Sequence, residues 1–192
     1  MAIDRKISII GLVAIVVLVL GGILHIVALA SPYWHQTYAD LYGGTARLHI
    51  GNAGLWVECI SWRGATTCIS PGISDEAWMG ATRAMAILGM LAGSGALVML
   101  GMYTFLRLDT WSRILKLSVI GTSITAGVLI LIGATIYGAS ATDGKYPPST
   151  FDITVSRRIV YTMSWAFGLS ITGAILCFVS AILTGFATKP KL

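Results

Sequence analysis

The stretch ISIIGLVAIVVLVLGGILHIVALA, from Ile7 to Ala30, contains no charged residue and a single histidine, His25. A helix rises about 1.5 Å per residue, so this run reaches about 36 Å, more than the roughly 30 Å of a bilayer's hydrocarbon core. Three more apolar runs follow, at Thr82–Leu106, Ile114–Ser140 and Ile159–Ala187. Because a backbone in lipid must satisfy its own hydrogen bonds, these runs predict four membrane-spanning helices.

The composition agrees with a membrane protein and excludes the soluble classes. Hydrophobic residues make up 56% of the 192 residues and charged residues 11%, with a mean hydropathy of +0.82. Soluble domains carry about 25% charged residues. The net charge of +5 does not indicate a nucleic-acid binder, because the Lys and Arg residues stand in twos and threes beside the apolar runs, as at membrane surfaces. We therefore expect one membrane domain, residues 1–192, that contacts the lipid bilayer and no nucleic acid.

Four crossings place both termini on the same side of the membrane as the short loop at residues 107–113. The basic residues expected on that side outnumber the acidic ones; they are Arg5, Lys6, Arg107, Arg113, Lys116, Lys189 and Lys191, against Asp4 and Asp109. On the other side basic and acidic residues balance, so the whole net charge of +5 lies with the termini. The positive-inside rule predicts cytoplasmic termini, with outer loops at about residues 31–81 and 141–158.

The first outer loop contains a predicted hairpin. The segment Leu55–Trp62 is rich in β-branched and aromatic residues, which indicates a strand, and Ala65–Ile69 resumes the pattern after Arg63-Gly64. If Arg63-Gly64 is a two-residue turn, Cys59 stands opposite Cys68 in a non-hydrogen-bonded pair. Their Cα atoms would then lie about 4.5 Å apart, within the range of a disulfide. We predict a Cys59–Cys68 disulfide, which the outer compartment favours.

The second outer loop and the third cysteine are less informative. Tyr146-Pro147-Pro148 excludes a helix in the second loop. Phe151–Val155 has the composition of a strand and is expected to join the sheet of the first loop. Cys177 lies inside the fourth apolar run, where we expect a buried free thiol.

No constellation of residues predicts an enzyme, a metal site or a bound cofactor. His25, His35 and His49 share no metal-ligand spacing, and the outer cysteines form no CxxC pair. Only His25 lies at membrane depth, where an ionisable group is a functional candidate by default. Because no second ionisable group lies at that depth, we favour a neutral histidine that is hydrogen-bonded to a neighbouring helix.

The first outer loop carries a pattern that resembles a known family. Trp34 is followed by Gly54-Leu55-Trp56, then by Cys59 and Cys68, all between the first two of four helices. This arrangement is similar to that of the claudins, whose superfamily includes peripheral myelin protein and calcium-channel gamma subunits. Arg83, within Ala81-Thr82-Arg83-Ala84, extends the likeness. The resemblance implies a membrane all-α four-helix bundle with a small extracellular antiparallel β-sheet.

The resemblance also implies a function. Claudins are proteins of tight and septate cell junctions that polymerise in the membrane and pair across adjoining cells. They form a paracellular barrier or a charge-selective pore. The expected location is thus the plasma membrane at cell–cell contacts, and the expected partner is the protein itself. The alternative is an auxiliary regulatory subunit of an ion channel or receptor, because such subunits carry a similar pattern.

Departures from the family pattern suggest a divergent, invertebrate member. The segment between Cys59 and Cys68 is slightly shorter than is usual in vertebrate claudins. Tyr161-Thr162-Met163-Ser164-Trp165 replaces a common tyrosine–x–glycine–tryptophan, and Lys189-Pro190-Lys191-Leu192 is no PDZ-type ending.

The two tryptophans of the pattern have an expected structural role. Trp34 and Trp56 should anchor the outer sheet onto the outer ends of the helices, where an amphipathic ring suits the interface. The alternative is that both are ordinary residues of an interfacial aromatic belt.

The charges of the first outer loop predict weak ion selectivity. Acidic residues outnumber basic ones between Ser31 and Gly80, and a negative wall would favour cations. Asp40 and Glu58 are the candidate selectivity residues. Arg63, at the hairpin tip, would place a positive charge where partner molecules meet. We therefore expect a barrier with at most a weak preference for cations.

Overall fold

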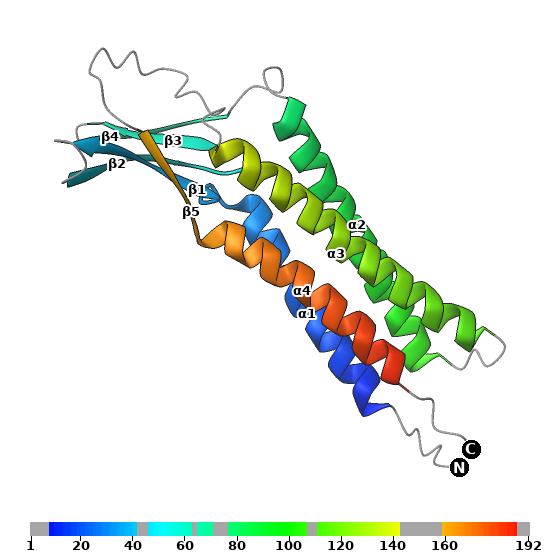
Figure 1. The fold of residues 1–192 in the computed structure, drawn as a ribbon. Coiled ribbons are helices and arrows are strands. Elements are labelled where there is room, and N and C mark those ends of the chain that lie inside the picture. The colour runs from blue at the N-terminus through cyan, green and yellow to red at the C-terminus, as the bar shows by residue number, and fades with distance from the viewer. Residues whose placement is uncertain are drawn as a thin grey trace.

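The computed structural model describes residues 8–41, 46–62, 65–70, 77–106, 111–142 and 159–187. Within these ranges the chain forms a bundle of long helices with a small sheet at one end (Figure 1). The helices are α1 (Ile9–Ala30), α2 (Ala77–Phe105), α3 (Ser112–Thr142) and α4 (Trp165–Phe186). All 4 are long and apolar enough to cross a membrane, which confirms the predicted four-span architecture.

Small residues allow the helices to approach one another closely. Along the bundle, α1 lies beside α4 and α2 beside α3 (Figure 1). A Cβ atom added to Gly21 of α1 would lie 2.9 Å from Leu176 Cβ, and one added to Gly173 of α4 would lie 2.8 Å from the Gly21 carbonyl oxygen. Lipid tails are as apolar as the helices, so close packing of this kind, rather than a hydrophobic drive, holds membrane helices together.

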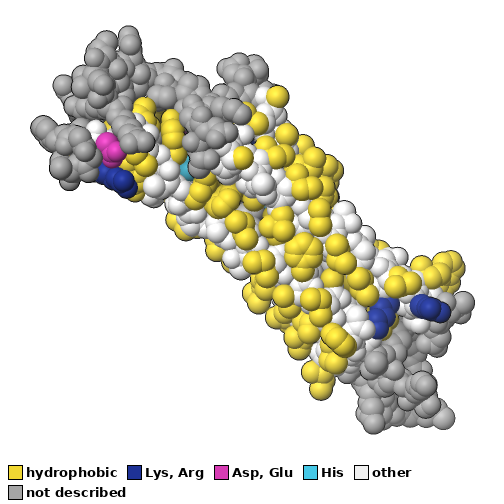
Figure 2. Space-filling view, viewed as in Figure 1, with side chains coloured by type: hydrophobic (Ala, Val, Ile, Leu, Met, Phe, Trp, Pro, Cys, Tyr) yellow, Lys and Arg dark blue, Asp and Glu magenta, His cyan; other side chains and the backbone are white. Residues whose placement is uncertain are grey.

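The bundle has an apolar outer surface and two apolar clusters inside. Figure 2 shows hydrophobic side chains along the length of the bundle, with charged side chains beyond them at the sheet and at the opposite end. One interior cluster includes Leu18, Leu100 and Val119. The other includes Trp34, a few residues after α1, and Tyr137 of α3, and lies where the sheet meets the helices. Sheet and bundle therefore share a core.

The sheet is built from the segment between α1 and α2 and from the residues just before α4. Its strands are β1 (His35–Leu41), β2 (Ala46–Ala53), β3 (Glu58–Trp62), β4 (Ala65–Ile69) and β5 (Ile159–Met163). The order is β4-β3-β2-β1-β5, and every neighbouring pair is antiparallel. Strands β1 to β4 follow the chain as a meander, and β5 joins from the far end of the sequence.

The prediction of a helix over Ile159–Ala187 is wrong at its beginning. Ile159–Met163 forms β5, which pairs with β1, and α4 begins only at Trp165. The residues of β5 are apolar and suit a buried strand as well as the first turn of a membrane helix, so hydropathy does not separate the two. These residues form a strand because the free edge of β1 provides a partner for their backbone hydrogen bonds.

The predicted start of the second helix also differs from the structure. The second helix begins at Ala77 rather than at Thr82, so it extends beyond its apolar core towards the sheet. Phe151–Val155, predicted as a strand, lies outside the described residues. Helix α1 begins and helix α4 ends at the end of the bundle away from the sheet (Figure 1).

Candidate functional site

The turn between β2 and β3 is the point at which the sheet enters the bundle. Ala53 pairs with Glu58, and inside that pair the Gly54 N–H donates to the Val57 carbonyl oxygen at 2.9 Å. Leu55 and Trp56 therefore form the tip of a hairpin. The Leu55 side chain is 0% exposed and belongs to the cluster between sheet and helices, whereas Trp56 is 39% exposed.

Gly54 is a glycine because the chain just after α1 passes directly over it. A Cβ atom at this position would collide with the carbonyl oxygen of Ser31 and the α-carbon of Pro32. Both obstacles are backbone atoms, which no rotamer change can move away. The absence of a side chain at Gly54 therefore lets the hairpin tip contact the start of the segment between α1 and α2.

Trp34 anchors the sheet to the bundle as predicted. Its side chain is 1% exposed, and its indole Nε1–H donates to the Ala28 carbonyl oxygen at the end of α1, at 2.7 Å. Its ring packs against Tyr137 of α3 and Phe167 of α4, with centroid separations of 4.9 Å and 6.0 Å. The Trp34 backbone also bonds to Ala53 and Ser164. One residue thus joins three helices to β2.

Trp56 has a different role from the one predicted. Its ring stays at the surface and contacts the bundle through Arg83 of α2, whose Cζ lies 5.1 Å from the ring centroid. The Arg83 Nε–H donates to the Leu55 carbonyl oxygen at 2.7 Å. At a tight tip consecutive side chains diverge, so only one of the pair enters the core, and that residue is Leu55.

The Cys59–Cys68 disulfide is present, and it lies in the predicted register. Trp62 pairs with Ala65 and Cys59 with Cys68 in the β3–β4 hairpin. The disulfide joins these strands with a Cα–Cα distance of 4.0 Å. Arg63-Gly64, the predicted turn, lies outside the described residues. The covalent bond fixes the outer edge of the sheet to the strand that carries Glu58.

Three buried polar residues under the sheet were not singled out from the sequence. The His35 Nδ1 atom lies 2.8 Å from the Tyr137 hydroxyl, and the Asn52 amide donates to the Pro32 carbonyl oxygen at 3.0 Å. Burial lowers the pKa of His35 to about 4, so the ring is neutral at physiological pH. Tyr137 offered a signal, since a phenol near the outer end of a membrane helix needs a hydrogen-bond partner.

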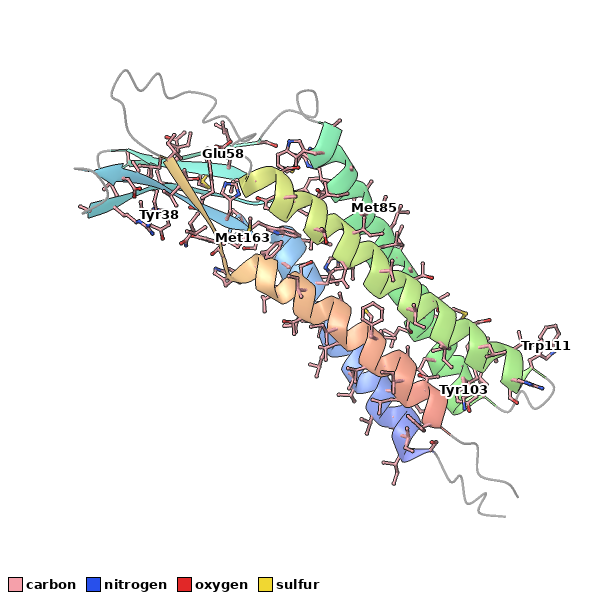
Figure 3. All side chains as sticks on the ribbon, in the orientation of Figure 1. Tyr38, Glu58, Met85, Tyr103, Trp111 and Met163 are labelled. Carbon is pink, nitrogen blue, oxygen red and sulfur yellow. A yellow bond between two sulfur atoms is a disulfide. The ribbon has the colours of Figure 1, made fainter. Side chains whose placement is uncertain are left out.

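The two candidate selectivity residues, Asp40 and Glu58, lie in different surroundings. Asp40 stands opposite Arg47 on β1 and β2, and Arg47 Nε lies 3.2 Å from the Asp40 carboxylate. Glu58 lies on β3 (Figure 3), and burial raises the pKa of its carboxyl group. Its charge also adds to the effect of burial in raising the pKa of Tyr161 on β5. Arg63 lies outside the described residues.

His25, the histidine at membrane depth, is hydrogen-bonded on both sides of its ring. The His25 Nε2–H donates to the Ala86 carbonyl oxygen of α2, and the Ser170 hydroxyl of α4 donates to Nδ1, both at 3.1 Å. A carbonyl only accepts, so this arrangement requires the neutral Nε2–H tautomer. His25 is thus hydrogen-bonded to neighbouring helices as predicted. Cys177 is a buried free thiol, as expected.

A comparison with protein families assigns the fold. The model of the PMP-22/EMP/MP20/Claudin family matches residues 7–185. The chain belongs to this family. The match runs from just before α1 to the last turn of α4 and includes all five strands. It confirms the resemblance seen in the Trp34, Gly54-Leu55-Trp56 and cysteine pattern. A search of curated proteins found no match.

Proposed function

We propose that this family member is a cell-junction protein that forms a paracellular barrier with at most a weak cation preference. It would do so by associating side by side in the membrane and by pairing across adjoining cells. The observation that carries the proposal is the sheet itself. A disulfide joins strands β3 and β4 within the sheet, and a shared core holds the sheet on the bundle. The sheet is therefore a preformed surface rather than a loop that must be ordered on binding.

Strand β4 offers the clearest place for contact with a second copy. All five of its residues are exposed, and it is an edge strand that pairs only with β3 among the described strands. Natural proteins usually cover or charge such an edge, since its unpaired backbone groups accept another strand. Ala65–Ile69 contains no charged residue and no proline, so nothing in its composition blocks pairing.

The charges of the described sheet support weak rather than strong selectivity. Asp40 is paired with Arg47, so its field is largely offset at a distance. Glu58 has no basic partner within the described ranges, and burial raises the pKa of its carboxyl group. Glu58 is therefore the better candidate to tune cation passage, with Asp40 second.

The location test uses contact between cells. Two populations of non-adherent cells, each expressing the full chain with a different fluorescent tag, are mixed and imaged. A junction protein should concentrate at the contacts between the two populations. Even distribution over the surface, with co-purification of a channel, would reject the proposal and favour an auxiliary subunit.

The electrical test uses a leaky epithelial monolayer. Expression should raise transepithelial resistance and leave the sodium-to-chloride dilution potential close to neutral, slightly on the cation side. Glu58→Gln should remove the cation preference, and Arg47→Gln, which leaves Asp40 unpaired, should increase it. Clear anion selectivity of the unmodified protein would contradict the charge argument.

The proposed orientation has its own test. Cytoplasmic termini follow from the excess of basic residues at that end, of which Arg113 and Lys116 are described by the structure. A tag at either terminus should be reached by antibody only after the cells are permeabilised.

A further inference from the structure

The Arg83 side chain is held in place by two contacts, but its terminal guanidinium nitrogens take part in neither. Its Nε–H is used by the Leu55 carbonyl oxygen, and its face lies over the Trp56 ring. Neither contact uses the two terminal nitrogens of the guanidinium group. Within the described ranges no acidic side chain forms an ion pair with Arg83. A positive charge with unused donors is therefore held at one defined place on α2.

Trp56 adds a further donor at the same place. The side chain is exposed, and its indole N–H has no acceptor among the residues that the structure describes. The Trp56 carbonyl oxygen, by contrast, accepts a bond from the Ser70 hydroxyl at 3.2 Å. The side chains of Arg83 and Trp56 thus present donors and no acceptors, which suits an anionic group made only of acceptors.

The depth of this pair follows from the apolar surface of α2. Large hydrophobic side chains are exposed on α2 from Ile87 to Phe105. At about 1.5 Å per residue this band is about 29 Å long, close to the roughly 30 Å of a hydrocarbon core. Arg83 lies one turn above the band. At the same end Tyr33 and Trp165 stack at 5.8 Å and are also exposed, as residues of an interfacial belt are.

We propose that Arg83 and Trp56 bind the phosphate group of a glycerophospholipid in the membrane leaflet on the side of the sheet. A guanidinium group pairs well with phosphate, and at headgroup depth the anion is always present. An acyl chain of the same lipid would lie along the exposed apolar band of α2, which begins one turn from Arg83 at Ile87 and Leu88. The inference does not depend on the barrier function.

The lipid would stabilise the turn that seats the sheet. Arg83 donates to the Leu55 carbonyl oxygen from one side of its guanidinium group and would contact phosphate from the other. Neutralising the charge of Arg83 removes the cost of holding an unpaired cation beside apolar surface. The bound lipid would therefore act as part of the connection between the sheet and α2.

The test is lipid retention by the purified full chain in mild detergent, measured by native mass spectrometry. The probes are palmitoyl-oleoyl phosphatidylcholine and the matching diacylglycerol, which has the same chains and no phosphate. The unmodified protein should retain the phospholipid and not the diacylglycerol. R83Q should weaken retention about tenfold or more, the effect of losing a charge-assisted hydrogen bond. R113Q, which removes an exposed arginine from the other end of the bundle, is the matched control and should behave like the unmodified protein.

The outcomes separate the possible occupants. Retention by a folded R83Q protein equal to that of the unmodified protein would overturn the proposal, as would equal retention of diacylglycerol. Displacement of the lipid by excess inorganic phosphate would show a free-anion site instead. Loss of self-association in R83Q with unchanged lipid retention would assign the site to a second copy. If R83Q does not fold, lipid retention is measured with W56F instead. This variant keeps an aromatic ring beside Arg83 and removes the indole N–H. Unchanged retention by W56F would then overturn the proposal.

Discussion

Replacement of Leu55 by alanine is expected to loosen the sheet from the bundle. The substitution removes three carbon atoms from a side chain that is 0% exposed and packed in the cluster between sheet and helices. At about 0.8 kcal/mol per buried methylene group, the transfer cost is about 2.4 kcal/mol. The cavity left behind adds to this, so the free energy of unfolding should fall by about 3 kcal/mol, within the usual range for Leu→Ala in a core.

Thermal unfolding in mild detergent measures this effect. For a chain of this size about 3 kcal/mol corresponds to a decrease in Tm of roughly 6–12 °C. Val57→Ala is the matched control, because Val57 lies in the same turn but is exposed, and it should change stability by less than about 1 kcal/mol. Equal decreases in Tm for the two variants would show that the turn does not insert into the core and would refute the reasoning.

Three more outcomes are expected. Replacing Cys59 and Cys68 together by serine should lower the free energy of unfolding by about 2–3 kcal/mol, the chain-entropy value for so short a loop. In the unmodified protein, peptide mapping under non-reducing conditions should find no free thiol at either position. The pKa of His35 is about 4 in the folded protein and 6.5 when the ring is exposed. Between these values the unfolded chain binds a proton more readily than the folded one. The free energy of unfolding should therefore fall as the pH drops through this window, by about 2 kcal/mol at pH 5. His35→Phe should flatten this pH dependence, and an unchanged slope in that variant would assign it to another group. His25→Leu removes two interhelical hydrogen bonds and should cost about 1 kcal/mol, measured by the same thermal assay; no loss would mean that these bonds contribute nothing net.

Local sequence patterns were sufficient for the spans and for one hairpin. The four apolar runs identify the helices because backbone in lipid has no alternative to internal hydrogen bonds. The β3–β4 hairpin was predictable residue by residue, since a two-residue turn determines every pair that follows it. Both arguments use only neighbours in the chain.

The start of the fourth helix shows where such arguments fail. Ile159–Met163 has a composition compatible with helix and with strand, and its partner, β1, lies near the other end of the sequence. No local pattern reports that β1 has a free edge at this position. The strand forms because the free edge of β1 supplies hydrogen-bond partners for the backbone of Ile159–Met163. A helix would instead satisfy those backbone groups within itself.

The tip of the β2–β3 hairpin shows the same limit for side chains. Sequence reasoning found the Gly54-Leu55-Trp56 pattern and expected the larger aromatic residue to be the anchor. Only the packed structure shows that Leu55 enters the core while Trp56 stays outside against Arg83. The direction of a side chain at a turn depends on backbone angles, which composition does not report.

The sequence by itself determined that this chain is a four-span membrane protein with a disulfide-closed hairpin between its first two helices, and its pattern pointed to the right family. Those features rest on hydropathy, on charge and on spacing along the chain. The tertiary structure decided how the sheet is held: Trp34 beneath it, Leu55 inserted through the turn, His35 and Tyr137 paired below it, and β5 added at its edge. These contacts join residues far apart in sequence, and their energy arises only when the helices and strands have packed together.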